Sequence, residues 1–596
     1  MKEKIKELYA LVSGTLIIRL LASWCFSAVF VSVYADGTFA DLDGYKKVGL
    51  GLVVGVIFIS FAVFTALSFI FKKIPTDRVL LPVFFGIYTF FIALSADSWY
   101  TLFGLGAAWA LLWFYYGQKG WVFIKKDIGK NTALFVTVLS VTLFVILVGA
   151  ASFFRYLTFS CPNYDFGIFC NMFYNMKTHF TPYTTCERDV YLSHFAVHIS
   201  PIYYVLLPVF CVFSSGGTLQ LSQIVLLASG VIPVYFIAKK YSLSNLRATL
   251  IACLYVLSPV LASGTNYDLH ENCFLAPLLL WMFYFFEKEK YIPFGIFAGL
   301  TLLVKEDAAV YVAIFALYMI FDRKKVLPGV ITGGGALVYF VIALALLSHY
   351  GSGAMTGRYS NFIAENGGLA EMVKNAVADP AYVFSQLFVS KDGSVSDKLL
   401  FILQMTLPLA FLPFTSKKPS RLLLLLPMVL VNLMTLYVYQ YRIGYQYAFG
   451  SFVFLFYLSI LNLSDMQPVT SRAVLNTASV ITAMCFLFAV LPRFSHYVTL
   501  YVADYENYAA MTELCESIPE DKSVVCSTFL LPHLANRDDV YEIEYHDPVK
   551  RGEADFVLID MRYKNKTFIE KYEELGYEIS DTLEVNGKKL ITVMTK

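Results

Sequence analysis

Long apolar runs separated by short polar loops dominate the chain. A helix needs about 20 mostly apolar residues to cross a bilayer, and about 17 are enough. Such runs predict about fifteen spans, near residues 13–34, 47–71, 79–95, 98–116, 132–153, 219–238, 246–263, 273–286, 291–304, 308–321, 327–348, 399–414, 421–439, 446–463 and 472–492. Several runs are short, so we expect tilted helices or helices that extend into polar flanks.

The distribution of Lys and Arg sets the predicted orientation. Cytoplasmic loops of membrane proteins are rich in these residues. With the N-terminal KEKIKE in the cytoplasm, the inner loops are KKIPTDR, QKGWVFIKKDIGK, KKYSLSNLR, EKEK, DRKK and SKKPSR, and each is basic or mixed. This register requires that a further apolar run, 199–214, lies along the interface instead of crossing. The chain is thus expected in the plasma membrane, with a cytoplasmic N-terminus and an extracytoplasmic C-terminus.

The last hundred residues follow a different pattern. Helix-like stretches (YENYAAMTELCESI, FIEKYEELGY) alternate with short β-branched runs (SVVCST, ADFVLID, KLITVMT), which is typical of a small α/β domain. The predicted fold is an all-α polytopic membrane protein with a small C-terminal α/β domain. We expect an accessory transmembrane module at 1–117, a transmembrane core at 118–495 with a long outer loop at 154–198, and a soluble outer domain at 496–596.

Composition agrees with a membrane protein. Only 15% of the residues are charged and 58% are hydrophobic, with a mean hydropathy of +0.62, whereas soluble domains are about 25% charged. Lys and Arg are spread over short loops and form no basic face, which argues against nucleic acid binding. Cys161, Cys170 and Cys186 share the outer loop, and Cys515 and Cys526 share the tail, but their pairing cannot be read from sequence.

The outer loop carries an early acid and two histidines. Asp165 follows the end of a span and Arg155, within an aromatic setting. Desolvation there would move its pKa toward the working pH of a general base; the alternative is a helix N-cap. His194 and His198 are spaced four apart, as metal ligands on a helix often are. His-x-x-x-His alone is a weak signal, and one histidine satisfied at the interface with the other exposed is the alternative.

Three titratable groups occur within four residues in TNYDLHENCF. Asp268 and His270 would point the same way in an extended chain, and Asp268 and Glu271 would do so on a helix. Either arrangement brings two acceptors together. The alternative is a solvated loop in which Asp268 caps the next helix. The density of ionisable groups favours a functional site.

Two further polar clusters lie on the same predicted side. Lys305, Glu306 and Asp307 sit between two apolar runs, where charges usually face a cavity, although snorkelling at a hairpin tip is the alternative. Arg442 is surrounded by tyrosines, including Tyr445, which could bind a phosphate and stack on a sugar; an aromatic belt is the alternative for the tyrosines. Together these clusters predict one outward cavity.

The motifs resemble a known family. YDFGIF, HFAVHISPIYYVLLPVF, YDLHENCFLAPLLL and LLVKEDAAV resemble the predicted-membrane-protein family called domain of unknown function 2079, over roughly residues 150–560. The long outer loop with an early Asp also looks like the C-class superfamily of integral-membrane glycosyltransferases. The resemblance implies inverting transfer of a sugar from a polyprenyl-phosphate donor to an outer glycan, glycolipid or protein acceptor. It also implies Asp165 as the base.

The predicted roles follow the chemistry of that reaction. Arg155, Lys305, Glu306, Arg442 and Tyr445 are expected to bind the donor phosphate and sugar. The other acids and histidines would line the cavity: His194, His198, Asp268, His270, Glu271 and Asp307.

A divalent cation is the one cofactor the reaction could require. Many C-class enzymes have a paired Asp motif, but Asp165 has no acidic neighbour. This departure argues against strict metal dependence. As the alternative to Lys305 and Arg442 at the departing phosphate, Asp268, Glu271 and His198 are the candidate ligands for Mg or Mn.

Two rival functions use the same features. A transporter or lipid flippase would also carry ionisable groups, but usually near the midplane of repeated halves, and no repeat is evident here. A non-catalytic cell-envelope scaffold would work through its outer tail.

Overall fold

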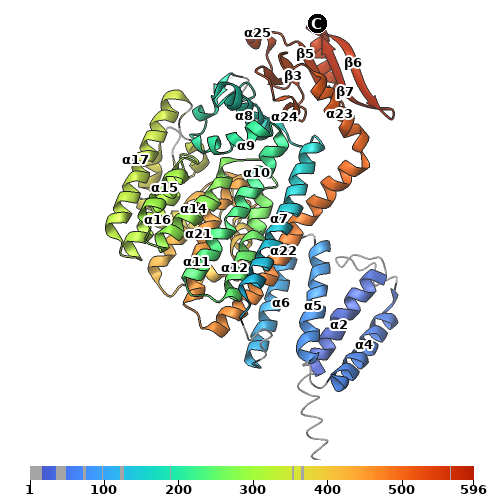
Figure 1. Ribbon diagram of the computed structural model, residues 1–596, viewed down its shortest axis with the longest axis vertical. Helices are drawn as coiled ribbons and strands as arrows, with labels where there is room; N and C mark the ends of the chain where they lie inside the picture. The colour runs from blue at the N-terminus through green and yellow to red at the C-terminus, as the bar shows by residue number, and fades with distance from the viewer. Residues whose placement is uncertain are drawn as a thin grey trace, which may run out of the picture. The chain divides into compact units, whose positions relative to one another are not determined.

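Helices make up most of the protein, as the sequence predicts (Figure 1). The computed structural model describes residues 16–34, 48–71, 76–96, 98–120, 127–187, 190–351, 353, 355–363, 368–563 and 565–596. The N-terminal KEKIKE and the loop residues 72–75 and 121–126, which helped to set the orientation, lie outside these ranges. Within them, nine helices are long and apolar enough to cross a membrane: Leu16–Tyr34, Leu50–Ile70, Arg78–Ser95, Lys130–Leu157, Gly216–Lys240, Asn245–Gly264, Val326–Tyr350, Gln446–Ser464 and Pro468–Ala503.

Other predicted spans form shorter helices. α14 (Leu275–Glu287), α15 (Tyr291–Leu302) and α16 (Ala308–Phe321) have 13, 12 and 14 residues. At 1.5 Å per residue each covers about 20 Å, less than the bilayer core of about 30 Å. They pack in sequence as antiparallel neighbours, and α16 continues by a short turn to α17 (Val326–Tyr350).

Two predicted spans are broken where prolines interrupt the apolar run. The run 399–414 forms α20 (Ser396–Thr406) and then a 3₁₀ turn at Leu412–Phe414. The run 421–439 forms a 3₁₀ segment at Pro419–Leu425 and a π-helix at Met428–Leu433. Proline lacks the amide donor and clashes with the preceding turn. Pro408, Pro413 and Pro427 lie in or between these segments.

The chain divides into two compact units. The first comprises Met1–Lys126 and Pro468–Leu491. It contains α2 (Leu16–Tyr34), α4 (Leu50–Ile70), α5 (Thr76–Ser95), α6 (Trp99–Gln118) and the first part of α22 (Pro468–Ala503). Aromatic contacts join its helices: the Phe26 ring lies 6.1 Å from Phe64 and 5.3 Å from Phe84.

The second unit, Asp127–Gln467 and Pro492–Lys596, is built around α21 (Phe449–Ser464). Residues 449–463 of that helix are all buried. A helix apolar on every side belongs in the centre of a bundle. α11 (Val231–Lys240), α12 (Asn245–Val256), α13 (Pro259–Gly264) and α14 contact this helix. α7 (Lys130–Leu157) packs against α12 and against α10 (Gly216–Ser229). Smaller helices at Leu369–Ala378 (α18) and Pro380–Gln386 (α19) follow α17.

The predicted outer loop is itself structured. A π-helix η1 (Asn163–Gly167) leads into α8 (Ile168–His179), and a small hairpin pairs β1 (Tyr183–Thr184) with β2 (Leu192–Ser193). A 3₁₀ turn follows at His194–Ala196. The apolar run 199–214 forms only a 3₁₀ segment at Pro201–Val205 and α9 (Leu207–Val212), and neither is long enough to cross a bilayer.

The C-terminal α/β region, residues 505–596, forms the predicted sheet with helices. Its five strands lie in the order β4-β3-β5-β7-β6. β3 pairs in parallel with β4 and β5, while β7 is antiparallel to β5 and β6. The elements are α23 (Tyr505–Ser517), β3 (Val524–Cys526), α24 (Leu531–Leu534), β4 (Val540–Glu542), α25 (Pro548–Arg551), β5 (Phe556–Asp560), α26 (Lys566–Glu574), β6 (Glu578–Val585) and β7 (Lys588–Thr595).

All ten cysteines lie within the described residues, and each is a free thiol. Cys186, Cys515 and Cys526 are buried in the core of the C-terminal region, where they act as small apolar side chains.

Candidate functional site

A cavity of about 500 Å³ opens in the second unit. Six stretches of chain that are far apart in sequence supply its wall. The lining residues are Asp165, Ile168, Phe169, Glu187, His194, Val197, His198, His270, Glu271, Lys305, Met355, Gly357, Arg358, Tyr437, Gln446 and Tyr447. Six of the residues predicted from sequence meet here: Asp165, His194, His198, His270, Glu271 and Lys305.

Asp165 presents a carboxylate to this cavity from the π-helix η1. Tyr267 donates its hydroxyl to Asp165 Oδ2 at 2.7 Å, and His270 Nε2 lies 3.4 Å from the same oxygen. The Asp165 side chain is 40% exposed, and its Oδ1 makes no hydrogen bond to any residue in the described ranges. One oxygen is therefore fixed by the protein while the other can accept a proton.

The charge of Asp165 is stabilised by its neighbour. Burial raises the pKa of Asp165, but His270 and the hydroxyl of Tyr267 outweigh burial, and the pKa lies below its usual value. Burial likewise lowers the pKa of His270, and Asp165 more than compensates. The expectation that desolvation moves the pKa of Asp165 upward is therefore wrong in direction, because an ion-pair partner sits beside it.

Glu271 and Lys305 form a buried ion pair in the same wall. Lys305 Nζ donates to Glu271 Oε1 at 2.8 Å, and Tyr203 donates its hydroxyl to Glu271 Oε2 at 2.8 Å. The Tyr203 hydroxyl in turn accepts the Glu271 amide at 2.9 Å. Burial opposes both charges, but the pairing raises the pKa of Lys305 and keeps that of Glu271 well below its usual value. A cation is thus held at the cavity at every physiological pH.

His198 pairs with Glu306 and not with the other candidate metal ligands, Asp268 and Glu271. His198 Nδ1 lies 2.9 Å from Glu306 Oε1, and the amide of Ile199 donates to Glu306 Oε2 at 3.1 Å. His194, the other member of the pair, is buried with Nδ1 3.5 Å from Glu187 Oε2. The two imidazoles line the cavity with separate acidic neighbours.

A second cavity, of about 210 Å³, adjoins the first. The two share His198, Lys305, Met355 and Arg358. The remaining lining is mainly apolar: Glu306, Asp307, Val310, Phe340, Leu344, Thr356, Tyr359, Met372, Leu430, Val431, Met434 and Gln440.

Asp307 brings an acid into the second cavity. Burial raises the pKa of Asp307 to about 6, although Lys305 opposes the rise. Lys305 and Arg358 line both cavities and lie where the polar cavity meets the apolar one. Of Glu271, Glu306 and Asp307, Asp307 alone has a raised pKa.

Arg358 is not among the residues that the sequence predicts. Its guanidinium lies 4.7 Å from the Tyr437 ring centre and 5.3 Å from that of Tyr447. Lys305 Nζ lies 6.0 Å from the same Tyr447 ring, so one aromatic ring contacts both cations. The only signal in the sequence is an arginine in a predicted outer loop, within TGRYS, and it has no patterned neighbours.

Three predicted donor-binding residues lie outside both cavities. Arg155 forms a buried ion pair with Asp268, and Gln220 donates to the same Asp268 oxygen. Arg442 is half exposed and pairs with Asp397 at 3.1 Å. The ring of Tyr445 lies 5.2 Å from that of Tyr267 at an angle of 53°, and Tyr445 does not line the cavity.

The side chains of DLHE therefore face different partners, an arrangement that neither the extended nor the helical prediction gives. His270 has extended backbone, and a 3₁₀ helix begins at Glu271. The change of conformation at this point turns His270 and Glu271 to the cavity and leaves Asp268 with Arg155. Asp268 is therefore a structural anchor between α7 and the DLHE stretch.

The three candidate metal ligands are not gathered. Asp268 is paired with Arg155, Glu271 with Lys305, and His198 with Glu306. Within the described ranges, no three His, Cys, Asp or Glu side chains are arranged to hold a metal ion. These residues do not fit the predicted divalent site, because cations of the protein already pair with both of its carboxylates, Asp268 and Glu271.

Comparisons with known proteins give one family match. A family model described as "Predicted membrane protein (DUF2079)" matches residues 155–580. No curated protein matches the chain. Among solved structures, the chain is similar to ArnT from Cupriavidus metallidurans bound to undecaprenyl phosphate, with 11% identity, a TM-score of 0.49 and coverage of 76% of this chain and 97% of that chain. The apo state of ArnT is also similar, with 12% identity, a TM-score of 0.42 and coverage of 77% and 97%.

Proposed function

The chain belongs to the DUF2079 family of predicted membrane proteins, and from that premise we propose that it is a membrane-embedded inverting glycosyltransferase. It would take a sugar from a polyprenyl-phosphate donor and transfer it to an extracytoplasmic hydroxyl acceptor. The motif resemblance to C-class glycosyltransferases supports the reaction class. One observation carries the proposal: a polar cavity with a carboxylate joins an apolar cavity at two shared cations.

The donor fits this pair of cavities by its chemistry. Its polyprenyl chain is apolar, its sugar is polar, and a phosphate joins them. The apolar cavity would take the first part of the chain, and the polar cavity would take the sugar. Lys305 and Arg358, which line both cavities, would hold the phosphate at the junction.

Asp165 would act as the base. The acceptor hydroxyl gives its proton to Asp165 as its oxygen bonds to the anomeric carbon. The bond from that carbon to the phosphate oxygen breaks, and its electron pair leaves with polyprenyl phosphate. Attack from the face opposite the phosphate inverts the anomeric centre. The lowered pKa keeps Asp165 ionised at neutral pH.

The charge of the departing phosphate would be stabilised by protein cations. Lys305 is kept in place by Glu271, and Arg358 by the rings of Tyr437 and Tyr447. Cations fixed before the reaction need no reorganisation as charge develops, and removing one such group typically costs about 10²–10³-fold in rate.

The test compares three substitutions of cationic residues. Purified protein in proteoliposomes is supplied with radiolabelled polyprenyl-phosphate sugars, and transfer of the label is measured. Lys305→Met and Arg358→Met should each lower kcat/KM by about 10²–10³-fold. Arg442→Met is the matched control, since Arg442 lies outside both cavities, and it should remain within about twofold of wild type.

Two results would contradict the proposal. Arg442→Met could lose as much activity as Arg358→Met, which would remove the special role of the cavity junction. Alternatively, the wild-type protein could move labelled lipid across the bilayer while every sugar stays on its phosphate, which would favour a flippase.

A further inference from the structure

The short turn that carries Asp165 is tied to the C-terminal α/β region. Asn163, two residues before Asp165, begins η1, and its side chain is buried. Its Nδ2 donates to Glu542 Oε2 at 2.7 Å and to the carbonyl of Cys186 at 3.3 Å. The backbone amide of Asn163 donates to Thr528 Oγ1 at 3.0 Å. The start of the turn is therefore fixed by a side chain at the end of β4 and by the loop after β3.

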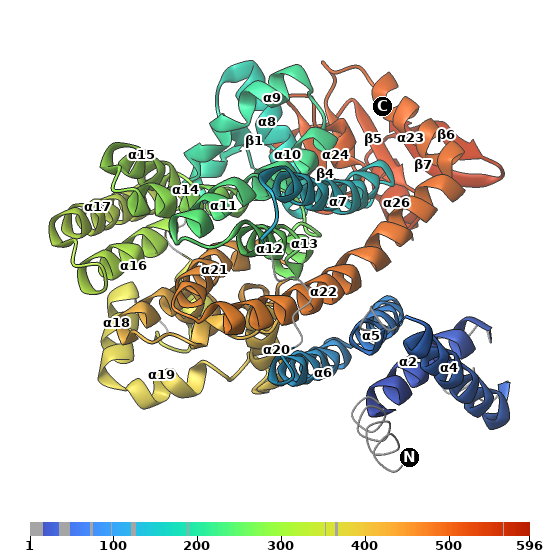
Figure 2. The ribbon, with the colours of Figure 1, turned by 60° about the horizontal axis from the view of Figure 1, so that its bottom comes forward.

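The other end of the turn also meets this region. A Cβ at Gly167 would lie 2.5 Å from Asn163 Oδ1 and 2.7 Å from Leu531 Cδ2, and real Cβ contacts are essentially never so short. Leu531 begins α24, which packs against η1 and α8. Figure 2 shows α24 near α8. The residues on both sides of Asp165 thus rest against the C-terminal α/β region.

Further contacts fix the chain that enters and leaves the turn. Arg562 donates to the carbonyls of Thr158 and Phe159, both at 2.9 Å, and its charge is paired with buried Asp560 at 2.7 Å. Asn171, on α8, donates to the carbonyls of Ala535 at 3.1 Å and Arg537 at 2.8 Å. Hydrogen bonds at several separate points hold the loop much more rigidly than one contact can.

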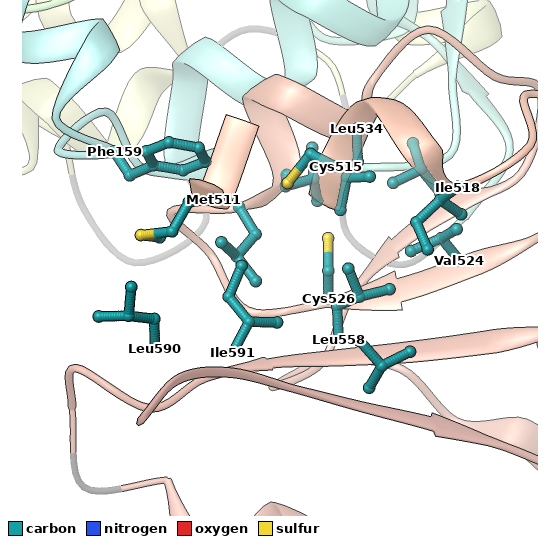
Figure 3. Packing of buried hydrophobic residues seen from close by; sticks show 14 of the residues in the cluster. Phe159, Met511, Cys515, Ile518, Val524, Cys526, Leu534, Leu558, Leu590 and Ile591 are labelled. Carbon is teal, nitrogen blue, oxygen red and sulfur yellow. The ribbon is translucent and has the colours of Figure 1, made fainter. Parts of the chain in front are cut away.

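The outer loop also completes the hydrophobic core of the C-terminal α/β region. Phe159 and Cys186 are buried in one cluster with Met511, Cys515 and other residues of that region. Figure 3 shows the ring of Phe159 beside Met511. The Phe159 ring also stacks on His533, with ring centres 3.7 Å apart. The region and the loop therefore share one core.

We infer that the C-terminal α/β region positions the carboxylate of Asp165, and that Glu542 is a positioning residue that acts through Asn163. Glu542 lines neither cavity, so it does not touch a substrate bound there. The inference rests on the proposed function, in which Asp165 is the base. It gives the C-terminal region a part in the reaction, because a base displaced by about 1 Å can lose about 10²-fold in rate.

The test uses Glu542→Ala and Glu542→Gln in the full-length protein, with kcat and the KM for the lipid donor measured separately. Glu542→Ala removes the acceptor for Asn163 and should lower kcat by about 10–10²-fold, with KM within about twofold. Glu542→Gln keeps a carbonyl oxygen that can accept the same hydrogen bond, and it should retain kcat within about threefold.

Asp555→Ala is the matched control for stability. Asp555 lies in the same region and accepts hydrogen bonds from Ser523 and Lys522, away from the outer loop. It should lower the melting temperature without lowering kcat. Should Glu542→Ala fail to accumulate, Thr528→Val removes the acceptor for the Asn163 amide and should give the same fall in kcat.

The outcomes separate the inference from the proposed function. Two results would overturn the positioning role. In the first, Glu542→Ala keeps the wild-type kcat. In the second, Asp555→Ala melts at the same temperature as Glu542→Ala and loses as much kcat. Asp165→Asn serves as the reference. If it is inactive while Glu542→Ala is fully active, the inference fails and the proposed function stands. If Asp165→Asn is fully active, the base assignment itself fails.

Discussion

His270 and Tyr267 act on one oxygen of Asp165 and leave the other open to the cavity. At the scale of single residues, this division explains how a carboxylate can be both fixed and reactive. One hydrogen bond and one ion pair orient the side chain, and the His270 charge keeps it ionised. The same logic applies to Lys305, whose charge is maintained by Glu271 in a buried position where an unpaired ammonium would be neutralised.

His270→Gln should move the acidic limb of the pH–rate profile to higher pH. Burial, which raises the pKa of Asp165, remains in this variant, whereas the charge that lowers it is removed. A base works only above its pKa, so activity should be lost at a less acidic pH than in wild type. The measurement is kcat/KM across the acidic and neutral range.

His179→Gln is the control for this profile. His179 is exposed and pairs with Asp538 on the protein surface. The acidic limb of the pH–rate profile of His179→Gln should therefore coincide with that of wild type. A limb that stays in place in His270→Gln, or moves to lower pH, would show that His270 does not set the pKa of Asp165.

The sequence identifies most of the cavity acids, histidines and Lys305 because charges beside apolar runs are rare and conspicuous. It does not separate Asp268 from Glu271, since that distinction depends on a change from extended chain to 3₁₀ helix at one residue. The sequence also favours Arg442 over Arg358 as the arginine that binds the donor phosphate. Tyrosines surround Arg442 in sequence, whereas the tyrosines that contact Arg358 come from about 80 residues further along the chain.

At the scale of elements, helix ends and breaks place the site. η1, the 3₁₀ helix at Glu271–Phe274 and the turn between α15 and α16 each bring one charged residue to the polar cavity. Long apolar runs are read easily from sequence, as α7 and α17 illustrate. The 3₁₀ and π segments at 419–433 cannot be predicted in this way, because their prolines allow either a kinked helix or a break.

Gly230→Ala should destabilise the protein. Gly230 joins α10 to α11, and a Cβ there would lie 2.1 Å from the Tyr255 hydroxyl. That hydroxyl is buried and donates to the carbonyl of Leu227 at 2.9 Å, so it cannot move aside freely. Overpacking of this kind costs about 1–3 kcal/mol, and the melting temperature in detergent should fall.

Gly295→Ala is the matched control, because a Cβ at Gly295 in α15 meets nothing within 4 Å. Its melting temperature should equal or exceed that of wild type, since Ala is the better helix former. Equal melting temperatures for Gly230→Ala and wild type would contradict the close packing at this helix junction.

At the scale of the whole molecule, the second unit brings together an apolar bundle, a structured outer loop and an α/β region. Sequence patterns predict the apolar bundle, the place of the outer loop at 154–198 and the alternation of strands and helices in 496–596, although α22 continues to Ala503 and the α/β region begins at Tyr505. The contacts between loop and sheet cannot be predicted in the same way, since they join residues more than 350 positions apart, such as Asn163 and Glu542. The position of Asp165 therefore depends on contacts between the outer loop and the C-terminal α/β region.

The most direct measurement is donor binding and sugar transfer by Asp165→Asn in the same proteoliposomes. Asn is nearly isosteric with Asp but is no base at neutral pH. Transfer from the polyprenyl-phosphate sugar should fall by about 10²–10⁴-fold, while the donor dissociation constant stays within about twofold of wild type, because Lys305 and Arg358 are untouched. Transfer at the wild-type rate by Asp165→Asn would contradict the account.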